Sequence, residues 1–100
     1  MRTQGARGTT EPSASEVTVR LTVRYFAAAR AAAGTESETL CLSSGTSVGA
    51  LLDQLAARHE KLARVLERCS FLCDGVAVRD EALNLSDGQI IDVLPPFAGG

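Results

Sequence analysis

The amino-acid sequence predicts a single α+β domain, in which one main helix packs on a mixed sheet of four or five strands. Two strand patterns come first, a helical pattern follows, and short apolar segments end the chain. This order is typical of a helix that covers one face of a sheet. The length of 100 residues matches one domain, and 45% hydrophobic residues suffice for one small core.

The first half of the chain contains two strand patterns joined by a short helical segment. Apolar and polar residues alternate along Val17–Tyr25, which predicts a strand with one buried and one exposed face. The alanine-rich segment Ala27–Ala33 favours a helix, and Gly34 stands where a C-terminal cap is expected. Glu38–Leu42 is predicted to be a second strand that pairs antiparallel with the first.

The main helix is predicted over Ser47–Arg58, with Thr46 or Ser47 as its N-cap. Its large apolar residues recur at helical spacing and are expected to be buried. They are Val48, Leu51, Leu52 and Leu55. A second, shorter helical pattern follows, with apolar positions at Leu62, Val65 and Leu66.

The second half of the chain predicts three more strands. Ser70–Cys73 and Val76–Val78 flank the hairpin signal Asp74-Gly75. Gln89–Leu94 is interpreted as apolar on both faces, so it is expected near the middle of the sheet. Taken together, these elements predict a β-grasp, or ubiquitin-like, roll over residues 16–94.

Composition excludes several classes of function. A net charge of −2 and the absence of Trp argue against a nucleic-acid or anionic-membrane binder. Three cysteines are an odd number, which disfavours a disulfide scaffold. Residues 1–15 contain few apolar side chains and no signal-peptide pattern, so they are predicted to be a disordered leader and the protein is expected in the cytoplasm.

Candidate catalytic and metal-ligating residues are scarce. His59 is the single histidine and stands at the end of a helical pattern, where an exposed, non-catalytic side chain is expected. Cys69 and Cys73 have no second cluster of Cys or His to complete a zinc site, so they are interpreted as structural thiols. We therefore expect no bound metal and no bound cofactor.

The C-terminal segment is the most informative part of the sequence. Pro95 and Pro96 end the last strand and favour an extended conformation, so residues 95–100 are predicted to leave the domain as a stiff tail. Six residues can reach about 20 Å. Gly99 and Gly100 remove every side chain near the terminal carboxylate, which suits entry into a narrow channel on another protein.

Residues 17–100 resemble the sulfur-carrier subunits of molybdopterin synthase, the MoaD family of ubiquitin-like proteins. Two segments carry the resemblance. Val23–Arg30, closed by Gly34, is similar to the family's first strand and short helix. Leu85–Gly88 and Asp92–Gly100 are similar to its last turn, strand and tail, although Gln89 stands where an acidic residue is common.

The resemblance implies a carrier that is not an enzyme on its own. In the family, an activating enzyme uses ATP to adenylate the terminal glycine, and a sulfur donor then converts it to a thiocarboxylate. The large synthase subunit, expected to form a heterotetramer with its carrier, transfers that sulfur to cyclic pyranopterin monophosphate. The resemblance thus assigns the sulfur to Gly100, clearance to Gly99, and docking to the arm formed by Pro95, Pro96, Phe97 and Ala98.

Three alternatives share the Gly-Gly terminus. One is a sulfur carrier for thiamine thiazole synthesis (the ThiS family) or for cysteine synthesis. The helical segment after Phe26 and the Pro-Pro-Phe arm favour the molybdopterin carrier over it. The others are a ubiquitin-like protein modifier, conjugated through Gly100, and a passive ubiquitin-like interaction domain.

Overall fold

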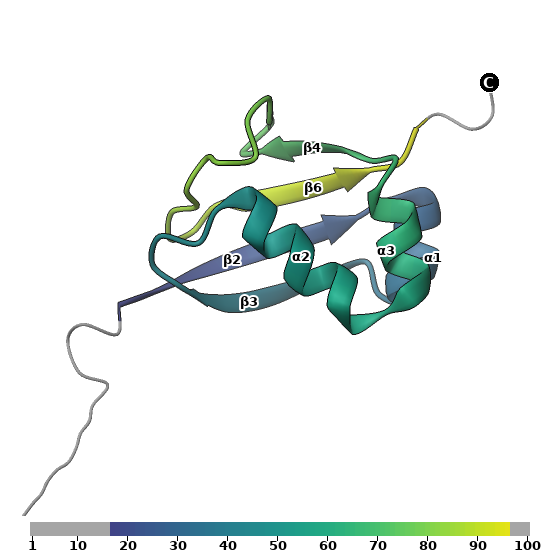
Figure 1. The fold of residues 1–100 in the computed structure, drawn as a ribbon, viewed down its shortest axis with the longest axis horizontal. Helices are drawn as coiled ribbons and strands as arrows, with labels where there is room; N and C mark the ends of the chain where they lie inside the picture. Colours follow the sequence, from purple (N-terminus) through teal and green to yellow (C-terminus); the bar gives the residue numbers. More distant parts are fainter. Residues whose placement is uncertain (1–16, 97–100) are drawn as a thin grey trace, which may run out of the picture.

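The computed structural model describes residues 17–96. The predicted leader at residues 1–15 and the tail residues Phe97, Ala98, Gly99 and Gly100 lie outside the described residues, so the predicted division of the chain remains a prediction. Five strands and three helices follow one another in the described part (Figure 1). They are β2 (Thr18–Tyr25), α1 (Ala27–Ala33), β3 (Ser37–Ser43), α2 (Val48–Arg58), α3 (Glu60–Leu66), β4 (Ser70–Cys73), β5 (Val76–Ala77) and β6 (Ile90–Leu94).

The five strands form one mixed sheet in the order β3-β2-β6-β4-β5. β2 pairs antiparallel with β3 and parallel with β6, while β4 pairs antiparallel with β6 and β5. The predicted pairing of the first two strands and the central place of the last strand are therefore confirmed. The arrangement, with helices over one face, is the β-grasp fold that the sequence predicts.

The core lies between the sheet and the helices. In β2 the inward residues Val19, Leu21, Val23 and Tyr25 are buried, as the alternation predicts. Ile91 and Val93 continue the same buried face in β6. The opposite face of the sheet, called here the outer face, carries the alternate residues of each strand, and none of the three helices between residues 17 and 96 covers it (Figure 1).

The main helix matches its predicted bounds, but one of its predicted core residues is wrong. Val48, Leu51 and Leu55 are fully buried, whereas Leu52 is only partly buried at the margin of the core. The three buried residues are spaced i, i+3 and i+7, so they form one narrow stripe, and Leu52 lies beside it. Ser47 is the N-cap, since its Oγ accepts a hydrogen bond from the Ala50 amide at 3.1 Å.

The two ends of the short helix α1 differ in backbone conformation. Gly34 is left-handed with φ 77° and its amide bonds to the Arg30 carbonyl, which confirms the predicted C-cap. At the start, Ala27 also has a positive φ, 50°, which is unusual for a residue with a side chain. Phe26, between β2 and α1, still has an extended backbone (φ −122°, ψ 150°) and is 40% exposed.

Cysteines and charged groups in the described part give no sign of a metal centre. Cys69 precedes β4 and its thiol donates to the Val65 carbonyl at 3.2 Å, while Cys73 is buried in β4. Between residues 17 and 96, no three Cys, His, Asp or Glu side chains gather at one point. In the same range no helix is long and apolar enough to cross a membrane.

We expect Leu55→Ala to lower the free energy of unfolding by about 2–5 kcal/mol, because a fully buried leucine leaves a cavity when it is truncated. Leu52→Ala is expected to cost clearly less, because part of that side chain already contacts water. Urea denaturation of both variants measures the difference. Equal losses would contradict the helix phase that the structure shows.

Candidate functional site at the root of the C-terminal tail

The described residues at the end of β6 form the root of the tail. Val93 pairs with Tyr25 of β2, and its carbonyl accepts a hydrogen bond from the Phe26 amide at 3.2 Å. Leu94 pairs with Ser70 of β4 on the other side. Pairing stops there, because Pro95 has no backbone N–H to donate.

Two of the predicted site residues belong to the described part. Pro95 is half-buried and Pro96 is exposed, at the end of the molecule where α1 and α3 lie (Figure 1). Gly100, Gly99, Ala98 and Phe97 lie outside the described residues, so their roles remain predictions. The structure thus describes the base from which the tail starts.

An ion pair on the outer face, which the sequence interpretation missed, joins the first and last strands of the domain beside this root. The Arg24 guanidinium donates to both oxygens of Asp92, with Nε to Oδ1 at 2.5 Å and Nη2 to Oδ2 at 2.9 Å. The Asp92 side chain is only 8% exposed and that of Arg24 is 48% exposed. Hydrogen bonding to the carboxylate raises the pKa of Arg24 above its usual value. The sequence interpretation that β6 is apolar on both faces is therefore wrong, because Asp92 lies on its outer face.

The sequence did contain a signal for this pair. Asp92 is the single charged residue in an otherwise apolar strand, and Arg24 lies on the polar face of β2. The parallel register places the two opposite each other. Only the register, which the sequence does not specify, shows that they meet.

Phe26 is a second feature that sequence reasoning missed. It is one of the large apolar side chains left exposed in the described chain, and it stands directly beside the tail root. The Arg24 guanidinium lies 5.9 Å from the centre of its ring, within cation–π range. An exposed aromatic ring beside a cation is typical of a contact surface rather than of a core.

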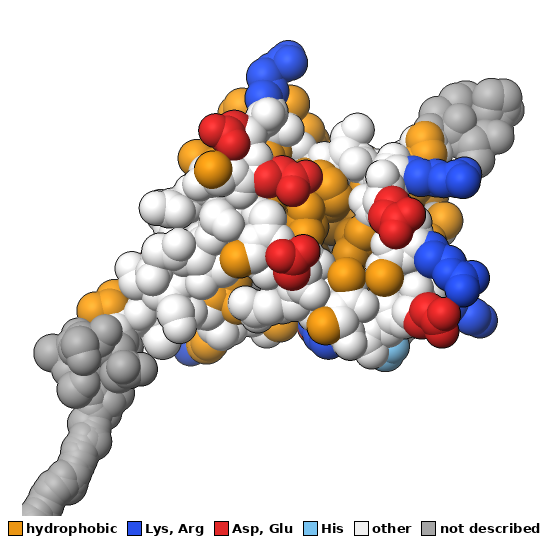
Figure 2. Space-filling model, in the orientation of Figure 1, with side chains coloured by type: hydrophobic (Ala, Val, Ile, Leu, Met, Phe, Trp, Pro, Cys, Tyr) orange, Lys and Arg blue, Asp and Glu red, His pale blue; other side chains and the backbone are white. Residues whose placement is uncertain are grey.

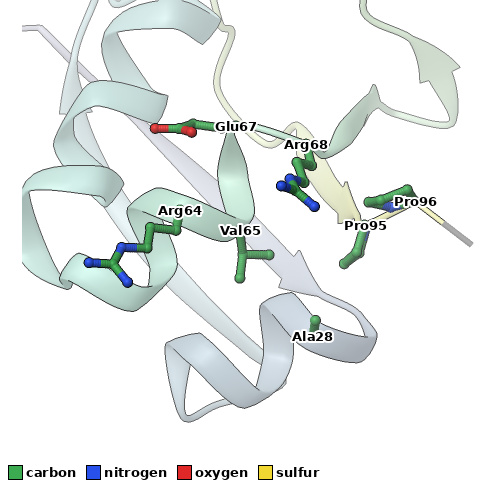
Figure 3. A pocket seen from close by; sticks show the side chains of 7 residues that line it. All are labelled: Ala28, Arg64, Val65, Glu67, Arg68, Pro95 and Pro96. Carbon is green, nitrogen blue, oxygen red and sulfur yellow. The ribbon is translucent and has the colours of Figure 1, made fainter. Parts of the chain in front are cut away.

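A pocket of about 450 Å³ lies on the helix side of the root, between α1, α3 and the Pro95–Pro96 segment (Figure 3). Ala28, Val65 and Pro95 give it an apolar lining, and Arg68 reaches toward the space between Val65 and the prolines. Figure 2 shows Lys and Arg side chains, interspersed with Asp and Glu, along this end of the domain.

The most strongly shifted titratable group in the described part has a structural role. Burial, with the hydrogen bond that the hydroxyl donates to Glu38 at 2.6 Å, raises the pKa of Tyr25 far above its usual value. Burial acts to raise the pKa of Glu38, but hydrogen bonds from Arg58 and Tyr25 outweigh it and lower that pKa. The cluster ties β2, β3 and α2 together.

Comparison with known proteins identifies the family. The model of the ThiS family matches residues 23–100. This chain belongs to that family. It is 34% identical, over 82% of its length and all of the relative's, to the molybdopterin synthase sulfur carrier subunit of Chlamydomonas reinhardtii. The resemblance to molybdopterin sulfur carriers that the sequence carries is thereby confirmed.

Solved structures of similar proteins share the fold. A putative molybdopterin converting factor subunit 1 from Pyrococcus furiosus superposes with a TM-score of 0.72 at 29% identity, covering 79% of this chain and 99% of that one. The small archaeal modifier protein 1 of Methanosarcina acetivorans gives 0.68 at 27% identity, covering 84% and 99%. The β-grasp fold thus serves relatives named for two different roles.

We expect Arg24→Gln to destabilise the domain more than Arg20→Gln does. Both arginines lie on the outer face of β2, but Arg24 neutralises the nearly buried Asp92, and its loss leaves that carboxylate without its partner. The thermal unfolding midpoints of the two variants give the comparison. Equal midpoints would show that the ion pair contributes nothing to the junction of β2 and β6.

Proposed function

We propose that this chain is the sulfur carrier of molybdopterin synthesis, with the sulfur held as a thiocarboxylate on Gly100. The observation that carries the proposal is its similarity, along the whole length of the relative, to a curated sulfur carrier subunit of molybdopterin synthase. The Gly-Gly terminus and the proline arm supply the chemistry and the reach that the role needs. The chain acts as a subunit, and its partners supply the catalytic groups.

The proposed reaction sequence begins and ends with the Gly100 carboxylate. An activating enzyme joins this carboxylate to the α-phosphate of ATP, which releases pyrophosphate and leaves an acyl-adenylate. A sulfur nucleophile at the oxidation level of sulfide displaces AMP and leaves a thiocarboxylate. In the large synthase subunit the thiocarboxylate sulfur bonds to a carbon of cyclic pyranopterin monophosphate and displaces an oxygen substituent from it. Water then cleaves the bond between the Gly100 carbonyl carbon and the sulfur, which leaves the sulfur on the pterin and restores the carboxylate.

Each of these steps requires from the carrier only a free carboxylate on an unobstructed tail of fixed origin. The described residues suit this requirement, because β6 is paired on both sides up to Val93, Leu94 is still paired with β4, and the chain then continues through two prolines. A proline pair limits the directions in which the tail can start. The rigid root lowers the entropy lost when the tail enters a partner.

The outer face next to the root is the surface that we propose for docking. Phe26 is exposed there, and Leu72 and Leu94 are half-buried on the same face, around the Arg24–Asp92 pair. Exposed apolar side chains surrounding a neutralised charge pair are typical of interfaces. We propose that the large synthase subunit covers this face, in a heterotetramer of two large and two small subunits, and that the activating enzyme receives the same tail in turn.

Two alternatives keep the same activation chemistry. A carrier for thiamine thiazole or cysteine synthesis would load sulfur on Gly100 and pass it to a different acceptor. A protein modifier would form an isopeptide bond with lysines, and the similarity to the small archaeal modifier protein of Methanosarcina acetivorans favours this second candidate. Isopeptide adducts in cell lysate would distinguish the modifier from both carriers.

We expect deletion of Gly100, or a C-terminal tag, to abolish sulfur loading while leaving the thermal unfolding midpoint unchanged. Deletion shortens the tail by about 3.3–3.6 Å, and misplacement on that scale costs a factor of about 100 or more in an oriented reaction. A tag replaces the reacting carboxylate by an amide. Intact-mass measurement after incubation with the activating enzyme, ATP and a sulfur source gives the loaded fraction.

An N-terminal tag is the matched control for the loading experiment, because it lengthens the chain by the same amount at the end remote from the reaction. It should leave loading at the level of the untagged chain. Full loading of a C-terminally tagged, uncleaved chain would refute the assignment of the sulfur to Gly100.

We expect Phe26→Ala to weaken binding to the large synthase subunit by about tenfold or more, as truncation of an aromatic interface anchor does. Its unfolding midpoint should change little, because the ring is 40% exposed. Leu83→Ala is the control, since Leu83 is similarly exposed at 46% but lies outside the tail root. Equal affinities of the two variants, measured by isothermal titration calorimetry, would place the docking surface elsewhere.

A further inference from the structure

The pocket between α1, α3 and the prolines lies on the helix side of the tail root. The docking surface proposed around Phe26 lies on the outer face and does not include this pocket. Its walls come from three separate segments, with Ala28 from α1, Val65 from α3 and Pro95 from the arm (Figure 3). At about 450 Å³ it is large enough for one or two amino-acid side chains of a partner. Because Pro95 belongs to the arm, a partner that binds the tail also contacts this pocket.

Charge at the pocket favours an acidic occupant. Arg68 lies just after α3, and its side chain reaches toward the space between Val65 and the prolines. Arg64 and Glu67 also line the pocket, but in Figure 3 their side chains extend away from it, and Arg64 is paired with Glu60 at 3.0 Å. Within the described part of the chain Arg68 takes part in none of the ion pairs, so its charge is available to a partner.

Continuity with the arm indicates which partner fills the pocket. Leu94 belongs to the outer face, and the next residue, Pro95, is a wall of the pocket. A protein that admits the tail into a channel surrounds the arm, so the rim of its channel contacts both the outer face and the helix side. The pocket therefore continues the docking surface around the arm.

Resting on the proposed function, we propose that the pocket receives an acidic segment at the channel rim of the large synthase subunit. An apolar side chain of that segment enters between Ala28, Val65 and Pro95, and an adjacent carboxylate pairs with Arg68. The pocket thereby fixes the rotation of the carrier about its tail, which an extended arm alone does not fix.

The test compares two pocket variants with matched controls outside the pocket. Arg68→Glu reverses the charge, and Lys61→Glu makes the same change two turns earlier on α3. Ala28→Leu fills the pocket, and Ala57→Leu adds the same atoms to an exposed position of α2. The control positions, Lys61 and Ala57, lie outside the pocket lining. All four substituted residues are exposed, so the fold should tolerate each change.

The measurements are the dissociation constant for the purified large subunit, at low and at high salt, and the unfolding midpoint of each variant. Arg68→Glu is expected to weaken binding about tenfold at low salt and less at high salt, because salt screens an exposed pair. Ala28→Leu is expected to weaken binding at both salt concentrations. Both controls should bind as the unaltered chain does, with unchanged unfolding midpoints.

Two results would overturn the inference. One is equal affinity of Arg68→Glu and Lys61→Glu, or of Ala28→Leu and Ala57→Leu. The other is unchanged binding to the large subunit together with slower loading by the activating enzyme, which would assign the pocket to that enzyme. Failure of the unaltered chain to load sulfur would instead refute the proposed function, so the two failures are distinguishable.

Discussion

The parallel pairing of β2 with β6 determines where the tail begins, and the rest of the site depends on it. It places Val93 beside Tyr25 and Asp92 beside Arg24, so the last strand ends next to the start of α1. A slip of one residue would turn Ile91 and Val93 outward and carry Asp92 into the core. The hydrophobic pattern and the Arg24–Asp92 ion pair both oppose that slip, and together they hold Pro95 in one position.

Two chemically different surfaces meet at that position. On the outer face Phe26, Leu72 and Leu94 present apolar area around a neutralised ion pair. On the helix side a small apolar pocket carries the charge of Arg68. A partner can therefore contact the root of the tail on both of its sides. Such contacts would fix how far the reactive end of a carrier enters the partner.

Much of this architecture could be predicted from the sequence, because the elements are locally specified. The alternation of apolar and polar residues predicted β2, the helical spacing of apolar residues predicted α2, and Gly34 predicted the end of α1. Leu52 was wrongly predicted to be fully buried because it lies at the edge of a narrow apolar stripe, where a small rotation of the helix changes how much of a side chain is buried. Phe26 was missed because the predicted strand ended at Tyr25. Its backbone is still extended, with φ −122° and ψ 150°, so its exposure continues the alternation of β2. The ion pair and the pocket depend on long-range register and on the packing of α1 against α3, which local patterns do not contain.

The central claim is that sulfur on Gly100 passes to a pyranopterin, and isotope transfer tests it most directly. The chain would be loaded with ³⁴S-labelled thiocarboxylate and mixed with the large synthase subunit and cyclic pyranopterin monophosphate. The account predicts that the intact mass of the chain falls by about 18 Da as one oxygen replaces the ³⁴S atom, and that the label appears in the dithiolene of molybdopterin. Label that stays on the chain, or that leaves it without entering the pterin, would contradict the account.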